Sequence, residues 1–519
     1  MSYEYRPFPY KRPIGLDRYE PQHKVLIVGA GPIGLAAAID LAQQGVPSVV
    51  LDDNNVVSVG SRAICWSKRS LEILDRLGVG NACVSKGVTW KVGRTFHQDT
   101  EVFNFDLLPE AGHKMPAFVN LQQYYVEEYL VRRAAEFPDL IDLRWKNKVV
   151  AMEQKPEGIR LTIETPDGAY ELTGEWLLAC DGANSDIRNM MKLRFDGELF
   201  EEKFLIADIE MTADFPSERW FWFEPPFHPG QSALLHKQPD NIYRIDLQLG
   251  WDADANAERQ PERIIPRIEK VVGHSNFRLD WASVYTFRCG RLANFVHDRV
   301  IFVGDSAHVV SPFGARGGNG GLQDVDALGW RLAAVVSGSA DRHILDGYDE
   351  ERCHGSDENI LNSSRTTRFM TPANGVERNF RDAVLALAHN CAFARPLVNS
   401  GRLSRPCIYP LKNAPDDPLL PAGSQPGSVA PDAPISTGWL LNQLGGHPVL
   451  LAIGTDTPEV SATRKVFVDA TPEIRARYLG DRASAIYLIR PDQVIAGRWA
   501  DFDAGAIANV VADIWGKQA

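Results

Sequence analysis

The sequence lacks the cysteine and histidine patterns that build disulfide frameworks and metal centres. Its seven cysteines are odd in number and include no CxxC pair, which favours free thiols in a reducing compartment over a disulfide-stabilised fold. Its twelve histidines include no HxH or HxxxH spacing, the spacings that suit a shared metal ion. We therefore expect neither a disulfide scaffold nor a metal site.

Positive charge and long apolar runs are also scarce. The chain carries 55 Lys and Arg against 67 Asp and Glu, a formal net charge of −12. This balance disfavours nucleic acid or an anionic membrane surface as a partner, while a local pocket of either sign remains compatible with it. No apolar run is long enough to span a bilayer, and the first residues contain no apolar core of signal-peptide length. We expect a cytoplasmic protein that binds neither nucleic acid nor membrane.

A strand–helix–strand pattern opens the ordered part of the sequence. The 519 residues are too many for one core and predict two or three domains. An apolar strand is predicted over 24–28, a helix over 32–44 and a second strand over 48–51. Pro32 suits the start of this helix and Gly45 its end. Fully apolar strands on either side of a helix indicate a parallel sheet and an α/β fold.

The remaining sequence changes character twice. Between about 200 and 287, short aromatic or β-branched segments separated by Pro, Gly and Asp predict a mixed or antiparallel sheet inserted into the first domain. Helices are predicted from 322 to about 398. The proline-rich stretch 409–436 is typical of a linker, and short strands followed by a helix over 504–515 predict a small C-terminal α/β domain.

The first glycine motif, Gly29-Ala30-Gly31-Pro32-Ile33-Gly34, lies between the first predicted strand and helix. Gly29 permits a tight turn, Gly31 lets a pyrophosphate approach the backbone, and Gly34 lets helix and strand pack closely. The phosphates would lie at the helix N-terminus. Asp52, or alternatively Asp53, ends the second strand and would accept a hydrogen bond from a ribose hydroxyl. This motif predicts a dinucleotide site without choosing between NAD and FAD.

Two later motifs make the pattern more specific. The stretches LACDGANSDIR (178–188) and GDSAHVVSPFGARGGNGGLQDVDALGW (304–330) resemble the DG and GD motifs of the single-component (group A) FAD-dependent aromatic hydroxylases, of the phenol hydroxylase and 3-(3-hydroxyphenyl)propionate hydroxylase type. The segments around Ser61–Ala63 and Gln123–Glu127 also resemble flavin-contacting elements of that family. The similarity covers about residues 24–400. It implies a Rossmann-like FAD-binding domain of the hydroxybenzoate-hydroxylase type, an inserted substrate-binding β-sheet and a C-terminal thioredoxin-like domain.

The domain boundaries expected from this resemblance are discontinuous. They are an N-terminal arm over 1–23; an FAD-binding domain over 24–90, 118–198 and 286–402; a substrate-binding sheet domain over 91–117 and 199–285; a linker over 403–436; and a thioredoxin-like domain over 437–519.

The resemblance also implies how FAD would be held. Asp305 would accept a hydrogen bond from a ribitol hydroxyl, and the glycine run after it would pass the isoalloxazine edge, where side chains would collide. The next helix, expected to begin near 319–322, would point its N–H groups at the N1/O2 edge of the ring. Asp181 would orient Arg188 or backbone donors rather than touch phosphate. The expected FAD contacts are Gly29, Gly31, Pro32, Ile33, Gly34, Asp52, Asp53, Arg62, Gln123, Asp181, Arg188, Gly304, Asp305, Pro312, Gly317, Gly318 and Asn319.

Three residues of the third motif are candidates for catalysis. Arg316 would favour anionic reduced flavin or an incoming nicotinamide cofactor; its alternative interpretation is a solvated arginine at the rim. His308 would shape the flavin face, and its alternative is a hydrogen-bonded core histidine. Pro312 would rigidify the loop over the flavin.

The resemblance implies an NAD(P)H-dependent monooxygenase. Such enzymes reduce FAD with NADH or NADPH, react it with O₂ and hydroxylate a phenol or another electron-rich aromatic compound through a C4a-hydroperoxyflavin. A homodimer is a further expectation. The candidate substrate residues on the inserted sheet are Trp220, Trp222, His236, Tyr243 and Arg244, although strand alternation places only half of them on the pocket face.

Three other functions fit parts of the sequence. A flavin-dependent NAD(P)H oxidase would use the same motifs without hydroxylating anything. A hydrolase would use Ser306 as nucleophile with His308, but no acid partner is evident in the sequence. A non-enzymatic binder of the GDP-dissociation-inhibitor type would share the fold without the flavin.

Overall fold

The strand–helix–strand unit is built into a mainly parallel sheet. The computed structural model describes residues 3–60, 62–398 and 403–516, and the parts of the predicted domains on other residues lie outside this description. The sheet has the order β17-β18-β11-β1-β2-β8, with β10 and β9 continuing from β11 as an antiparallel extension. Its strands are β1 (His23–Val28), β2 (Ser48–Asp52), β8 (Ile141–Trp145), β9 (Lys148–Lys155), β10 (Gly158–Thr165), β11 (Gly168–Ala179), β17 (Val296–His297) and β18 (Val300–Phe302).

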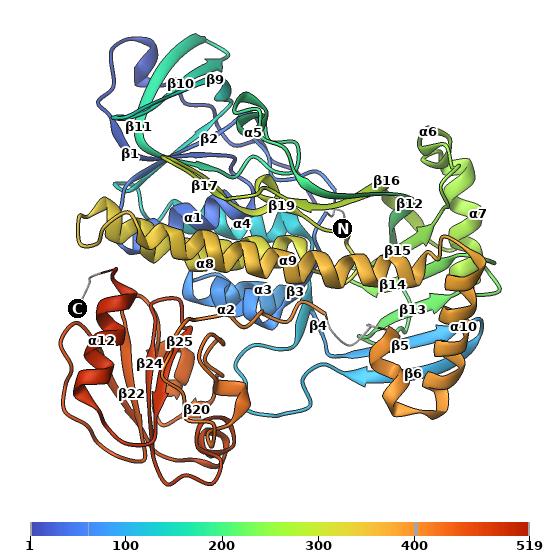
Figure 1. Cartoon of the computed structure of the whole chain (residues 1–519). Helices are drawn as coiled ribbons and strands as arrows, with labels where there is room; N and C mark the ends of the chain where they lie inside the picture. Colours follow the sequence, from blue (N-terminus) through green and yellow to red (C-terminus); the bar gives the residue numbers. More distant parts are fainter. Residues whose placement is uncertain (1–2, 61, 399–402, 517–519) are drawn as a thin grey trace.

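Helices cover this sheet and bury its apolar strands. The helix after the first glycine turn, α1, is buried along its length because Ala, Leu and Ile fill most of it, and it packs against α4 and α8. Figure 1 shows α8 and α9 crossing the middle of the molecule, with α9 reaching from the parallel sheet to the second sheet. These helices are α1 (Pro32–Gln43), α4 (Gln123–Ala134), α5 (Asp186–Met190), α8 (Gly317–Val336), α9 (Ile344–Met370) and α10 (Gly375–Asn390).

The inserted sheet is a second, mostly antiparallel layer in the order β19-β16-β12-β15-β14-β13-β5-β6. Both stretches predicted for it, 91–117 and 199–285, contribute strands. One face packs against α7, and the other meets α9, α10 and Phe313. Its elements are β5 (Val92–His97), β6 (Thr100–Asp106), β12 (Asp196–Glu210), β13 (Arg219–Phe223), β14 (Ser232–Lys237), β15 (Ile242–Gln248), β16 (Arg278–Arg291), β19 (His308–Val309), α6 (Ala255–Glu258) and α7 (Pro261–Val272).

A small sheet, not predicted from the sequence, lies between these two layers. It has the order β3-β7-β4, and each strand is only three residues long, too short for the hydrophobic pattern to reveal. It leads into two short helices on the face toward the C-terminal domain. The elements are β3 (Cys65–Ser67), β4 (Val88–Trp90), β7 (Phe118–Asn120), α2 (Lys68–Arg76) and α3 (Gly80–Lys86).

The C-terminal domain has a sheet of its own with the order β23-β22-β24-β25. β22 pairs with β23 in parallel, and the other pairs are antiparallel. This topology agrees with the predicted additional α/β domain; its thioredoxin-like character stays a prediction. The elements are β20 (Pro434–Ile435), β21 (Gly438–Trp439), β22 (Val449–Ile453), β23 (Arg464–Val468), β24 (Ala485–Ile489), β25 (Ile495–Trp499), α11 (Pro472–Ile474) and α12 (Ala504–Ile514).

The predicted linker is packed rather than free. Leu420, Ala430 and Ala433 lie in the apolar core of the C-terminal domain. The backbone N–H of Gly427 donates to the carbonyl of Ile495 at 2.8 Å, and the N–H of Ile495 donates to Ser428 at 2.9 Å. The prolines therefore shape a strap on the domain's surface instead of a flexible connection.

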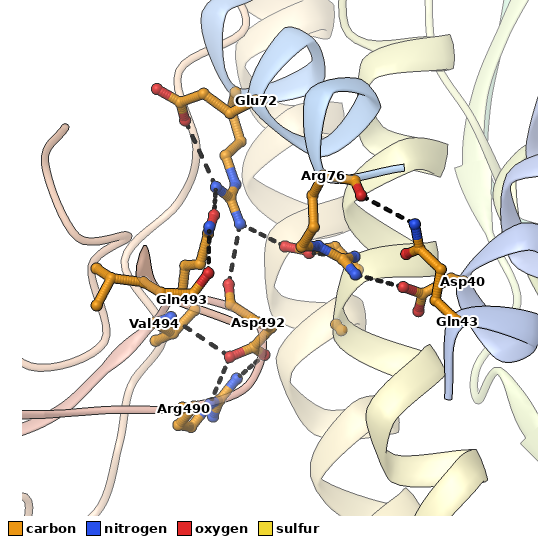
Figure 2. A network of polar contacts seen from close by, with 12 residues as sticks. Asp40, Gln43, Glu72, Arg76, Arg490, Asp492, Gln493 and Val494 are labelled. Carbon is orange, nitrogen blue, oxygen red and sulfur yellow. Dashed lines mark hydrogen bonds and ion pairs between the residues drawn. The ribbon is translucent and has the colours of Figure 1, made fainter. Parts of the chain in front are cut away.

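A buried polar network joins the C-terminal domain to the FAD-side helices. Asp492 and Gln493, between β24 and β25, lie beside α2 (Figure 2). Arg69 of α2 donates to the Asp492 carbonyl at 2.9 Å and to Gln493 Oε1 at 2.7 Å. Arg490 donates to both carboxylate oxygens of Glu351 on α9. The domain is thus fixed to two helices that frame the predicted flavin site.

No helix among the described residues combines the length and the apolar character needed to cross a membrane.

Candidate functional site

The first glycine turn has the geometry that its sequence predicts. Gly29 has φ +103°, a left-handed conformation that favours glycine, and a Cβ there would lie 2.4 Å from the Cys180 carbonyl oxygen. A Cβ on Gly34 would lie 1.9 Å from the Gly29 oxygen, so this glycine permits the strand–helix contact. Around Gly31, by contrast, a Cβ would meet nothing within 4 Å. The backbone at Gly31 therefore faces open space at the N-terminus of α1.

The residues around this turn connect it to two other parts of the site. Asp52 accepts from the Ala30 N–H at 2.6 Å and from the Asn54 N–H at 2.8 Å, and burial raises the pKa of its carboxyl. Asp53 is exposed. Pro32 begins α1, and Ile33 lies where a Cβ on Gly304 would contact it at 3.2 Å. The first and third motifs therefore meet directly.

Gln123 holds the segment that contains Arg62. Its Oε1 accepts from the Ala63 N–H at 3.1 Å, and its Nε2 donates to Ser58 at 3.0 Å and to Glu127 at 2.8 Å. The Arg62 side chain is exposed, while its carbonyl accepts from Arg244 of the second sheet at 2.9 Å. Ser61, the other residue of this predicted contact, lies outside the described residues.

The second motif forms a turn between β11 and α5. Asp181 Oδ2 accepts from the Ile187 N–H at 3.0 Å, whereas its Oδ1 is buried and has no hydrogen-bond partner among the described residues. Burial raises the pKa of this carboxyl. Arg188 donates to the carbonyls of Ala183 at 2.6 Å and Ser306 at 3.1 Å. Asp181 thus orients a backbone donor, as one alternative predicted, and Arg188 ties the second motif to the third.

In the third motif the Asp305 carboxylate is accessible, whereas the neighbouring Ser306 and His308 side chains are buried. The Asp305 side chain is accessible, yet desolvation raises its pKa, the combination expected for a carboxyl inside a hollow of the protein. Ser306 Oγ is fully buried and donates to the Ala179 carbonyl at 2.5 Å. His308 is 1% exposed, and its Nε2 lies 2.7 Å from Asp324 Oδ2. His308 therefore occupies the position of a core histidine, the alternative to its predicted catalytic role.

The flavin-side end of α8 begins earlier than predicted, at Gly317 rather than near 319–322. A Cβ on Gly317 would meet nothing closer than 3.9 Å, and one on Gly318 would lie in ordinary contact with Trp66 and Ala63 at 3.5 and 3.6 Å. Asn319 is 2% exposed and fixes this end by donating to the carbonyls of Cys65 and Ala315 and accepting from the Ser67 N–H. Its side chain is therefore committed to protein contacts.

Arg316 and Pro312 differ in their surroundings. Arg316 is 4% exposed, occupies the N-cap position of α8 and donates to Asn359 of α9 at 2.9 Å. The alternative of a solvated rim arginine is therefore wrong, because two helices enclose the side chain. Pro312 is exposed, and the next residue, Phe313, packs on Phe204 of the second sheet with ring centroids 4.6 Å apart.

The second sheet separates the candidate substrate residues by face. Trp222 and Tyr243 pack in the apolar cluster with α7, away from the small sheet and the flavin loop, and the Tyr243 hydroxyl donates to Ala213 at 3.0 Å. Trp220 lies two residues before Trp222 on β13 and therefore shares this face. Their assignment to the substrate is corrected: period-two alternation points them into the core under α7. His236 and Arg244 lie on the opposite face.

The opposite face carries a row of four polar side chains. Only two of them, His236 and Arg244, were predicted from the sequence as candidate site residues. Directly paired positions on β13, β14, β15 and β12 place Arg219, His236, Arg244 and Asp208 side by side. Arg244 forms a two-pronged ion pair with Asp208, at 2.9 and 3.1 Å. His236 Nδ1 lies 3.9 Å from Cys65 Sγ. A charged residue at the start of an otherwise aromatic strand, RWFWF (219–223), was the available signal for Arg219.

The three motifs together fit FAD better than a purely structural role. Gly31 and Gly182 face open space, the Asp181 Oδ1 atom lacks a partner, and the Asp305 carboxyl accepts no hydrogen bond from the described residues. Backbone N–H groups at the starts of α1 and α8 suit phosphate and the ring edge, respectively. No group of three or more His, Cys, Asp or Glu among the described residues is arranged to hold a metal ion.

Comparison with known proteins agrees with this geometry. A family model described as an FAD binding domain matches residues 22–362. The chain is 28% identical over 499 residues to a 12-dehydrotetracycline 5-monooxygenase/anhydrotetracycline 6-monooxygenase of Streptomyces rimosus subsp. rimosus, with 91% of this chain and 95% of that protein covered. It is 24% identical over 512 residues to a 3-(3-hydroxy-phenyl)propionate/3-hydroxycinnamic acid hydroxylase of Mycolicibacterium smegmatis, with 91% and 90% covered.

Solved structures show that the fold is shared over nearly the whole chain. A flavin-dependent monooxygenase in complex with FAD and substrate superposes with a TM-score of 0.79 at 20% identity, covering 96% of this chain and 100% of that one. An anhydrotetracycline hydroxylase from Streptomyces rimosus gives a TM-score of 0.76 at 23% identity, covering 96% and 100%.

Proposed function

We propose that this chain, which belongs to the FAD binding domain family, is an FAD-dependent monooxygenase. It would hydroxylate a phenolic or other electron-rich aromatic compound with NAD(P)H and O₂. In this reaction one oxygen atom of O₂ forms the new C–O bond and the other leaves as water. NAD(P)H supplies two electrons as hydride, and solvent supplies one proton. The observation that carries the proposal is the meeting of three distant motifs around the unpartnered Asp305 carboxyl and the open backbone of Gly31.

We assign the binding of FAD to these motifs. The start of α1, with Gly31 and Pro32, would hold the pyrophosphate, and Asp52 the adenosine ribose. Asp305 would accept from the ribitol, and the N–H groups of Gly317 and Gly318 would face the ring. When bound, FAD supplies the reductive activation of O₂ and the transfer of an oxygen atom. Ile33, Gly34, Gln123, Asp181, Arg188, Gly304 and Asn319 would act by shaping these segments, and Gly29 by forming the turn.

The protein's own contribution is orientation, charge and exclusion of water. Arg316, buried at the start of α8, places a positive charge beside the helix N-terminus, where both stabilise developing negative charge. The Pro312–Phe313 loop closes over the second sheet through the Phe313–Phe204 contact. The polar row on that sheet lies next to Cys65, whose carbonyl accepts from Asn319. A substrate between the sheet and the α8 end would thus be enclosed by protein.

Two alternatives are less favoured by the geometry. A hydrolase is disfavoured because Ser306 Oγ is buried and donates to Ala179, while His308 pairs with Asp324. A non-enzymatic binding protein of the GDP-dissociation-inhibitor type, which binds no flavin, would not need accessible backbone N–H groups at the starts of both α1 and α8. An NAD(P)H oxidase shares every cofactor contact, so product formation separates it from a hydroxylase.

The test is NADH and NADPH oxidation by the FAD-loaded protein across a panel of phenols and aromatic acids, with chromatography of the products. Release of flavin on denaturation is measured first, because a colourless protein without flavin would contradict the proposal. We expect one compound to accelerate oxidation and to gain one hydroxyl group, with its oxygen derived from ¹⁸O₂. Hydrogen peroxide without any hydroxylated product from the panel would favour the oxidase.

The cytoplasmic location and a homodimer are parts of the same proposal. Free cysteines throughout the described chain are compatible with a reducing compartment. Light scattering at several protein concentrations tests the dimer.

A further inference from the structure

Arg219 is a buried cation without a protein acceptor. It begins β13 and is 8% exposed, and its guanidinium donates no hydrogen bond to any described residue. The guanidinium carbon lies 5.9 Å from the centroid of the Phe221 ring. Burial lowers the pKa of this arginine. A buried charge with no partner is costly, and proteins keep such groups where a ligand completes them.

The neighbouring arginine shows the contrast. Arg244 lies two strands away in the same row, and both oxygens of Asp208 pair with it. That ion pair is internally neutral. Among the described residues, Arg219 has no carboxylate paired with it in this way.

A second group beside Arg219 also lacks a partner. Asp246 lies on the same face of β15, one row further along, and its Oδ1 is fully buried without a hydrogen-bond partner among the described residues. The row that contains it also holds Phe221 and Leu234. The unpaired Arg219 cation next to an apolar, aromatic surface suits a ligand that offers both an anionic group and an aromatic ring.

The polar row that contains Arg219 and His236 lies close to the N-terminal end of α8. Cys65 contacts His236 of the row at 3.9 Å through its sulfur and Asn319 at 2.8 Å through its carbonyl. Ala315, in the loop before α8, packs in the same apolar cluster as Cys65 and Phe105. Phe105 covers Gly93, the position paired with Arg219 on β5. The row is therefore part of the wall that faces the proposed flavin site.

We infer that the substrate is an aromatic compound that carries a carboxylate, and that Arg219 binds this carboxylate. This inference rests on the proposed function and narrows its substrate class. The Arg219 guanidinium would donate two parallel hydrogen bonds to the anion.

The probe for this inference is benzoate, the smallest aromatic carboxylate, compared with benzamide, which has the same shape and no charge. Calorimetric titration of the FAD-loaded protein is expected to show at least about tenfold tighter binding of benzoate, the usual effect of a charge-assisted pair. Arg219→Met should abolish this preference, and Arg219→Lys should retain part of it. Equal binding of the two probes, or no benzoate binding at tens of millimolar, would overturn the inference.

The matched control is Arg94→Met on the adjacent strand. Arg94 points to the other face of the sheet and pairs with Glu218 and Glu101, so its loss should leave the benzoate preference unchanged. A preference lost equally in both variants would contradict a specific role for Arg219.

Thermal unfolding without ligand gives an independent readout. Arg219→Met should leave the melting temperature unchanged or raise it, because it removes an unpaired buried charge. Arg244→Met should lower it by at least about 5 °C, because Asp208 would be left buried and unpaired. A similar loss in both variants would make Arg219 structural and overturn the inference.

Failure of the inference and failure of the proposed function give different results. If neutral phenols are hydroxylated and Arg219→Met changes nothing, the proposed monooxygenase activity is supported and the inferred carboxylate on the substrate is wrong. If Arg219 governs benzoate binding but no hydroxylated product forms, carboxylate binding by Arg219 is supported and the proposed hydroxylation is wrong.

Discussion

His308 Nε2 lies 2.7 Å from Asp324 Oδ2, and Asp324 also accepts from Arg352 Nε at 2.6 Å and from the Gly304 N–H at 2.9 Å. Burial alone would raise the pKa of Asp324, but His308 and Arg352 hold it below its usual value. The carboxylate is therefore ionised and anchors the turn from which Asp305 projects. Two neighbouring acids thus have different tasks: Asp324 holds the turn, and Asp305 is left open.

This division predicts opposite effects of two similar substitutions. Asp305→Asn should leave the stability of the FAD-free protein unchanged and weaken FAD binding by about tenfold or more, because a charge-assisted hydrogen bond is lost. Asp324→Asn should reduce the free energy of unfolding by about 3 kcal/mol, because His308 and Arg352 lose a buried partner. Urea unfolding and flavin fluorescence titration measure the two effects. Equal loss of stability in both variants would contradict the division.

The glycines of the first motif should also separate binding from folding. Gly31→Ala places a methyl group in open space, so the FAD-free protein should melt at the wild-type temperature while FAD affinity falls. Gly34→Ala drives a methyl group against the Gly29 carbonyl and should lower the melting temperature itself. Retention of wild-type FAD affinity by Gly31→Ala would show that the pyrophosphate does not lie there.

Asp246 should make stability depend on pH. Burial and the nearby Asp208 raise its pKa to about 6 against the pull of Arg244 and Arg219. A raised folded-state pKa gives stability that is full below the unfolded value near 3.9 and is lost as pH rises through about 6. Asp246→Asn should therefore exceed the wild type in stability at pH 8 by about 3 kcal/mol, and the gap should close toward pH 4.

His236 acts in the opposite direction over an overlapping range, because burial and two arginines lower its pKa. The measurement is therefore the difference between Asp246→Asn and wild type in urea unfolding at each pH, in which the His236 contribution largely cancels. A difference that does not change between pH 4 and 8 would show that Asp246 keeps its ordinary pKa.

The polar network of Figure 2 should make the C-terminal domain part of the stability of the FAD-side helices. Arg490 binds both oxygens of Glu351 and also pairs with Asp492. Arg490→Met leaves two buried carboxylates and should cost about 3–5 kcal/mol in the free energy of unfolding. Arg482→Met, which breaks a partly exposed pair with Asp417 in the same domain, should cost less than about 1 kcal/mol. Separate melting of the two domains in wild type would contradict this coupling.

The local sequence determined much of the fold because hydrophobic period and glycine chemistry act over a few residues. β1, α1 and β2 begin and end within one residue of their predicted positions, and so does α12. Gly29 forms the tight turn and Gly34 permits the strand–helix contact that their spacing predicts, while the pyrophosphate contact of Gly31 stays a prediction. Family membership followed from three motifs in order along the chain.

Only the tertiary structure decided which side chains share a site. Trp222 and Tyr243 alternate toward α7, while His236 and Arg244 face the opposite side, and no sequence pattern says which face of a sheet will meet a flavin loop. His308 became a core residue because Asp324, sixteen positions later on α8, reaches back to it. Arg219 stands out only when its neighbours across three strands are known, since a missing partner is a property of packing and not of sequence.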